Sequence, residues 1–144
     1  MKTLLHTFLL LVTLTSAIAD TAVKAGPRKG RLLEFSPTQS AEFFVEKDRT
    51  ISIAFYDAAM KAQPPAAQVV TATAEAPTGK TKIDFAPKGT LLVATAPLPA
   101  GEDYQVVVQV KPDATSKPKN FRIKLLLYTC KECGNAEYAC ICDH

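Results

Sequence analysis

The residues best suited to chemistry lie together at the C-terminal end of the chain. Cys130, Cys133, Cys140, Cys142 and His144 follow one another with the spacing C-x2-C-x6-C-x-C-x-H. These are all four cysteines of the 144-residue chain and one of its two histidines. Thiolate and imidazole are the ligands that soft and borderline metal ions prefer in proteins. The pattern therefore indicates a metal site.

The first pair of cysteines has the spacing of a chelating turn. Two thiolates on one tight turn, as in Cys130-x-x-Cys133, can bind a single ion. Gly134 follows the pair and permits a positive φ, which lets backbone N–H groups turn toward the sulfurs. This half of the pattern resembles a zinc knuckle.

The second half, Cys140-x-Cys142-x-His144, places donors at alternate positions. In an extended strand these three side chains would share one face, and the six-residue spacer allows the chain to reverse first. Four sulfurs, or three sulfurs and the imidazole of His144, would complete a tetrahedral shell at about 2.3 Å per Zn–S bond. The same donors suit Cu(I), which prefers thiolates at low coordination number. We therefore expect Zn(II) or Cu(I) as the bound ion.

The combined spacing resembles a fragment of a bacterial metallothionein, which implies metal binding, but two other uses of the cysteines stay open. In an exported protein, pairing Cys130 with Cys140 and Cys133 with Cys142 would make a compact disulfide knot. A redox-active C-x-x-C is the third interpretation, although the motif follows a predicted strand instead of a thioredoxin-like strand-to-helix turn. His144 has no role in a disulfide knot, and a domain of this size needs no terminal staples.

Residues 1–19 have the three parts of a secretory signal peptide. Lys2 supplies a positive charge, residues 4–14 are mostly apolar, and Ala17-Ile18-Ala19 is a small-x-small cleavage site. The apolar run is shorter than the roughly 20 residues that span a bilayer. We therefore expect export to the periplasm or the exterior, without a membrane span.

The rest of the chain divides into three parts. Residues 20–30 mix small, Pro, Gly and basic residues, which predicts a solvated arm. Residues 31–128 predict a β domain, and residues 129–144 form the Cys/His tail. Runs with strand periodicity, separated by turn residues, cover 31–35, 41–46, 50–57, 68–75, 80–85, 90–96, 104–111 and 120–128.

These strands predict an all-β fold, an immunoglobulin-like two-sheet antiparallel sandwich of seven or eight strands with a short irregular Cys-rich tail. Alternation of apolar and polar residues indicates antiparallel sheets with one wet face. Leu98, Gly101 and Tyr104, followed by alternating valines, resemble the tyrosine corner of immunoglobulin-like domains. That resemblance implies that the Tyr104 hydroxyl bonds back to the main chain upstream.

Composition and charge exclude several classes of function. A formal net charge of +3 disfavours nucleic-acid binding. A Ser-His-Asp or Cys-His triad needs a histidine on a rigid scaffold, and beyond the predicted signal peptide the chain has only His144. The carboxylates, Glu42 and Glu46 among them, are typical of a solvated surface. We expect that the protein is not an enzyme.

The layout is similar to that of small periplasmic sandwich proteins of metal handling, the CopC-like and YtkA-like groups. That resemblance implies the fold and the compartment. The chain departs from those groups because it lacks their His and Met ligands. The first hypothesis is an exported protein that sequesters a metal ion or delivers it to an export system or another periplasmic protein. The alternative is a secreted, non-enzymatic binding or adhesion module whose tail is held by two disulfides. Neither hypothesis fixes an oligomeric state.

Overall fold

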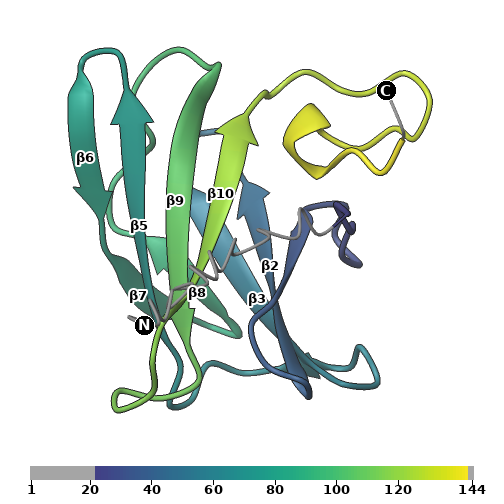
Figure 1. The fold of residues 1–144 in the computed structure, drawn as a ribbon, viewed down its shortest axis with the longest axis vertical. Coiled ribbons are helices and arrows are strands. Elements are labelled where there is room, and N and C mark those ends of the chain that lie inside the picture. Colours follow the sequence, from purple (N-terminus) through teal and green to yellow (C-terminus); the bar gives the residue numbers. More distant parts are fainter. Residues whose placement is uncertain (1–21, 143–144) are drawn as a thin grey trace, which may run out of the picture.

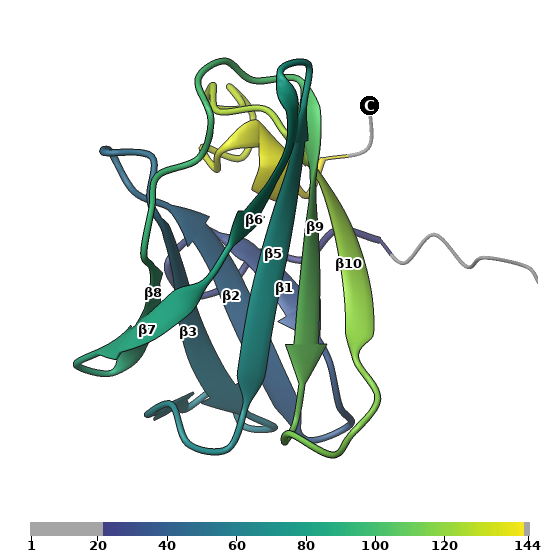
Figure 2. The same cartoon turned by 90° about the vertical axis from the view of Figure 1, so that its left-hand side faces the viewer.

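Two antiparallel β-sheets packed face to face make up most of the protein in a computed structural model that describes residues 22–142 (Figure 1; Figure 2). The predicted signal peptide, residues 1–19, and His144 lie outside the described residues. The strands are β1 Arg31–Glu34, β2 Gln39–Val45, β3 Ile51–Asp57, β4 Ala62–Gln63, β5 Val69–Ala76, β6 Gly79–Ile83, β7 Phe85–Lys88, β8 Leu91–Ala94, β9 Tyr104–Lys111 and β10 Lys119–Leu125. One 3-10 helix, η1 Glu137–Ala139, follows in the tail.

The strand order confirms the predicted sandwich. One sheet has the order β1-β2-β3-β8-β7, with β4 paired to β3, and the other has the order β10-β9-β5-β6. Strands β2, β3, β8 and β7 take the places of A, B, E and D in an immunoglobulin sandwich, and β10, β9, β5 and β6 take those of G, F, C and C′. The two sheets are thus linked as in immunoglobulin-like domains.

Alternating side chains from both sheets fill the core between them. Along β5 and β9 every second residue is buried, as the sequence predicts. The largest fully buried apolar side chains are Phe43, Phe55, Leu33, Ile51, Ile53, Ile83, Ile123, Leu125, Val106, Val108 and Val110. None of the four cysteines belongs to this core cluster.

The structure has two strands more than the sequence predicts. The predicted strand 80–85 is in fact two strands, because the chain crosses at Asp84 from β6 in one sheet to β7 in the other. Pro87 lies within β7, in the stretch between the predicted strands 80–85 and 90–96 where the sequence predicts a turn. β7 is at the edge of its sheet, the position in a sheet where proline is tolerated. The other extra strand, β4, has only two residues.

The predicted tyrosine corner is present. Tyr104 opens β9, and its hydroxyl donates a hydrogen bond of 2.8 Å to the Pro99 carbonyl oxygen. The Arg49 guanidinium also donates to the carbonyl oxygens of Pro99 and Gly101. This corner ties the loop before β9 to the turn between β2 and β3.

The N-terminal segment differs from the solvated arm that the sequence predicts, since residues 24–30 contact the sheet of β1, β2 and β3. The backbone N–H groups of Arg28 and Gly30 donate to the Glu42 carboxylate, which is fully buried. The Tyr56 hydroxyl donates to the other oxygen of the same carboxylate at 2.7 Å. Glu42 is therefore not a solvated surface carboxylate, and every residue of β3 except the last is buried.

Candidate metal centre

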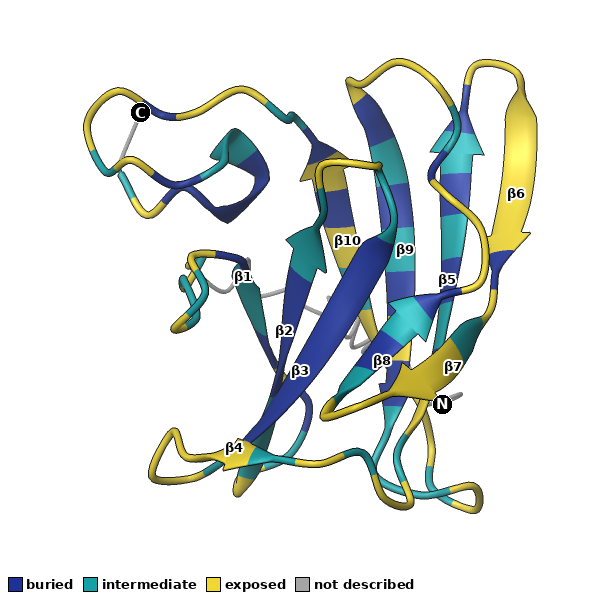
Figure 3. Cartoon of the chain, turned by 180° about the vertical axis from the view of Figure 1, so that it is seen from behind, coloured by how far each residue is buried: buried dark blue, intermediate teal, exposed yellow. Residues whose placement is uncertain are grey.

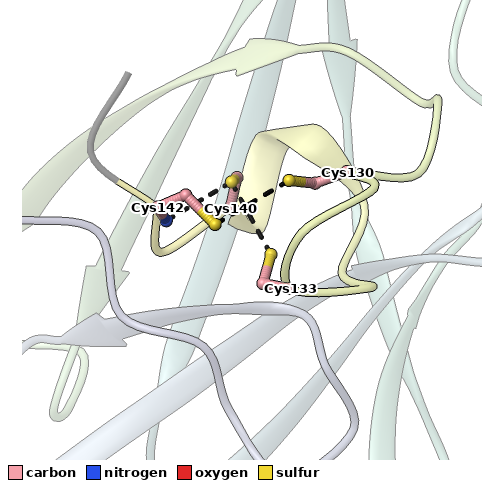
Figure 4. Close-up of side chains that lie close together, drawn as sticks. All are labelled: Cys130, Cys133, Cys140 and Cys142. Carbon is pink, nitrogen blue, oxygen red and sulfur yellow. Dashed lines mark hydrogen bonds between the residues drawn. The ribbon is translucent and has the colours of Figure 1, made fainter.

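The four cysteine sulfurs of the tail meet in one cluster. Each lies within 4.8 Å of the other three, a grouping that could hold a metal ion (Figure 4). The Sγ atoms of Cys133 and Cys140 are 3.6 Å apart, and those of Cys130 and Cys142 are 3.9 Å apart. The structure thus brings together all the predicted cysteine ligands, whereas His144 lies outside the described residues.

Two of the distances between sulfurs can be compared with the edge of a tetrahedral metal shell. A regular tetrahedron with Zn–S bonds of about 2.3 Å has edges of about 3.8 Å between sulfurs. A disulfide needs sulfurs about 2.0 Å apart. The observed separations of 3.6 and 3.9 Å bracket the tetrahedral edge and are far from the disulfide bond length.

A tight turn positions the first two cysteines. The Cys130 N–H donates to the Asn135 carbonyl oxygen, and the Gly134 N–H donates to the Cys130 carbonyl oxygen. Gly134 has a φ of 71°, a left-handed conformation in which glycine carries no Cβ penalty. The turn therefore has the geometry that the sequence predicts from the glycine after Cys133.

The second two cysteines follow η1 and do not form the extended strand that their alternate spacing predicts. The Cys140 N–H donates to the Glu137 carbonyl oxygen and ends the helix. The Cys142 N–H donates to the Cys140 sulfur at 3.4 Å, which holds the two residues close to one another. Neither residue lies in a strand, so alternation along a strand does not place their sulfurs.

Tyr138 anchors the tail in the sandwich. Its ring is buried and meets the Phe43 ring edge to face at 5.5 Å between centroids. The Tyr138 hydroxyl accepts a hydrogen bond of 3.1 Å from the Val45 N–H of β2. β10 ends at Leu125 instead of Tyr128 because Leu125 pairs with Tyr104, the first residue of β9. The N–H groups of Glu137 and Tyr138 then donate to carbonyl oxygens of the chain just after β10.

Backbone amides make the cluster electrostatically uneven. The N–H groups of Asn135 and Ile141 point at the Cys133 sulfur and lower the pKa of that thiol to about 6. Burial and the neighbouring thiols raise the pKa of Cys142. The main cause at Cys133 is thus the loop backbone.

A second polar cluster, on the outer face of β2 and β3, was not predicted from the sequence. Arg28 donates to Glu46 at 2.7 Å and to Ser52 at 2.9 Å, and its guanidinium stacks over the Phe44 ring. One feature of the sequence could have indicated it. The outward residues of β3, Ser52, Ala54 and Tyr56, carry no charge, as expected where other residues cover that face of the strand.

Among residues 22–142, no helix combines the length and the apolar character needed to cross a membrane. Comparison with protein families, with curated proteins and with solved structures finds no match for this chain.

Proposed function

We propose that the protein binds one metal ion through Cys130, Cys133, Cys140 and Cys142. The observation that carries the proposal is the mutual distance of the four sulfurs, all within 4.8 Å. The shape of the cluster fits a four-coordinate shell, and the amides that face Cys133 stabilise a thiolate.

Zn(II) is the ion that this donor set favours. Four thiolates in a tetrahedron are a closed shell for Zn(II), whereas Cu(I) is satisfied by fewer sulfurs. Because four sulfurs complete the shell, His144 is not needed as a ligand in this arrangement. A Cu(I) complex of the same cysteines would leave one or two of them unbound.

We propose sequestration or delivery of the ion as the role, without enzymatic activity and outside the cytoplasm. Support for an exchangeable ion comes from the placement of the cluster in a terminal loop, where Cys133 and Cys142 keep partial solvent exposure. The sandwich has a core of its own that includes none of the cysteines. Support for export is the signal-peptide pattern of residues 1–19.

The test is the metal content of the purified protein, measured by native mass spectrometry and by elemental analysis. We expect one Zn(II) per chain and four thiols that become titratable only after a chelator removes the ion. A variant with all four cysteines replaced by serine should bind no metal and keep the far-ultraviolet circular dichroism of the sandwich. Absence of metal together with absence of free thiols in the wild type would instead support the disulfide-stapled binding module.

The comparison of Zn(II) with Cu(I) needs a second measurement. Competition with a chromophoric chelator for each ion, under reducing conditions, gives the two affinities on the same protein. A complex in which all four thiols resist alkylation supports Zn(II). A complex with one or two reactive thiols supports Cu(I).

A further inference from the structure

A broad groove runs from the cysteine loop across the outer face of β2, β3 and β8. Its volume is about 1300 Å³, and Gly134, Ala136 and Tyr138 of the tail form one end of it. Figure 3 shows this face of the sheet, with the tail beside β1 and β2. An occupant of the groove would therefore approach the cluster from the side of Cys133.

The floor of the groove is apolar and incompletely covered. Phe44, Leu91 and Val93 line it as half-buried side chains of the outer face, and Val45 and Leu127, which also pack against the core, line the end beside the tail. Apolar surface of this kind gains free energy when a partner removes it from water. The floor thus suits a segment that carries apolar side chains.

The rim of the groove is cationic. Five basic and two acidic side chains line it, and both acidic ones are engaged within the protein: Glu46 with Arg28 and Ser52, and Asp48 with Thr50. Lys29, Lys47 and Lys88 have no carboxylate within 4.0 Å among the described residues. The rim keeps an excess of positive charge, although Lys88 also interacts with the charge of Asp48, and an anionic occupant would complement that excess.

We propose that this groove docks an acidic segment with apolar side chains, supplied by the protein that exchanges metal with the cysteine cluster. The inference rests on the proposed metal-binding function. Lysine ammonium groups would pair with the carboxylates of the segment, and its apolar side chains would cover the floor. The exchange moves Zn(II) from one set of thiolates to another without electron transfer. The acceptor thiols release protons as they bind the ion, and the donor thiolates take protons up.

The test uses the zinc-loaded full chain and two labelled peptides. One peptide alternates Glu with Leu and ends in Cys-x-x-Cys, and the other has Lys at each Glu position. Fluorescence anisotropy gives the affinity, and zinc transfer to the peptide gives the exchange rate. We expect the acidic peptide to bind more tightly, to lose affinity as salt is added, and to receive zinc faster.

The decisive variant is Lys29→Glu/Lys47→Glu/Lys88→Glu, which should weaken binding of the acidic peptide by about tenfold or more. The matched control is Lys61→Glu/Lys111→Glu/Lys117→Glu, which changes net charge equally at lysines that do not line the groove. It should retain the wild-type affinity within about twofold. Equal weakening by both variants, or equal binding of both peptides, would overturn the proposal.

Two further outcomes separate this inference from the metal proposal and from self-association. The variant without cysteines should still bind the acidic peptide, so the docking proposal is tested even if the protein holds no metal. Loss of peptide binding in that variant, with the sandwich intact, would overturn the proposal that the groove binds the peptide independently of the cysteines. If the wild type is a dimer and the groove variant is a monomer, a second copy of the chain occupies the groove. That outcome would also overturn the proposal.

Discussion

The Val45 backbone N–H donates to the Tyr138 hydroxyl at 3.1 Å, and this bond joins β2 to the tail across 93 positions of the sequence. The Tyr138 ring also packs edge to face against Phe43, two residues earlier in β2. The Tyr138 side chain therefore attaches the cysteine loop to the hydrophobic core, in which Ala139 of the same helix is also buried. The stability of the sandwich and the geometry of the sulfur cluster are coupled through this attachment.

Replacing Tyr138 should test this coupling. We expect Tyr138→Ala to lower the free energy of unfolding by about 3 kcal/mol or more, because it removes a buried aromatic ring. Tyr138→Phe should cost only about 1 kcal/mol, for the hydroxyl that accepts from Val45. Both values come from urea denaturation, and zinc affinity should fall in the alanine variant because the loop loses its anchor.

The matched control is Tyr128, whose ring is 57% exposed although it lies in the same segment. Tyr128→Ala should change the unfolding free energy by no more than about 0.5 kcal/mol. If the alanine variants at 128 and 138 lost equal stability, the proposed anchor would be wrong.

Cys133 should be the most reactive thiol of the metal-free protein. The N–H groups of Asn135 and Ile141 lower its pKa to about 6, whereas burial raises the pKa of Cys142. A thiol is mostly thiolate above its pKa, so at pH 7 Cys133 is ionised while Cys142 stays protonated. Alkylation with iodoacetamide from pH 5 to 8, followed by peptide mapping, should label Cys133 first with a midpoint near pH 6.

Zinc-loaded protein is the control for that experiment, since coordination should protect all four sulfurs. Parallel labelling of the four cysteines at every pH in the metal-free protein would contradict the effect of the loop amides.

Local signals made most of the fold predictable. The tyrosine corner, the alternation in β5 and β9 and the turn glycine after Cys133 depend on residues close together in sequence. Burial of Glu42 was not predictable in the same way, because the N–H groups of Arg28 and Gly30 that satisfy it come from a separate segment. Burying an unpaired charge at that position would be unfavourable. The burial of Glu42 therefore depends on contacts with another segment, which the local sequence pattern does not show.

The metal centre shows the same division. Spacing alone identified Cys130, Cys133, Cys140 and Cys142 as one group, and the structure gathers them. The expected strand geometry of the second pair was wrong, since η1 precedes the pair and neither cysteine lies in a strand. Three residues of 3-10 helix are too few for a period to be recognised.

The carboxylate of Glu42 should contribute to stability through Tyr56. The Tyr56 hydroxyl donates to Glu42 at 2.7 Å. Burial raises the pKa of the phenol most, and this hydrogen bond raises it further. Tyr56→Phe would leave a buried carboxylate oxygen with one donor fewer, so we expect a loss of about 1–3 kcal/mol. Urea denaturation measures it, with Tyr128→Phe as an exposed control. A loss as small as that of the control would show that the bond to Glu42 contributes little.

Oxidation of the metal-free protein should pair Cys133 with Cys140 and Cys130 with Cys142. Their sulfurs lie 3.6 and 3.9 Å apart in the folded tail, whereas the sequence alone does not choose among the three possible connectivities. With hydrogen peroxide as oxidant, each disulfide forms as two thiols lose two electrons and two protons and one peroxide becomes two waters. Proteolysis under non-reducing conditions, followed by mass spectrometry, identifies the pairs. Zinc-loaded protein should oxidise more slowly, because the metal occupies the lone pairs that attack the oxidant. Disulfides within the C-x-x-C and C-x-C pairs would contradict the arrangement of the loop around η1.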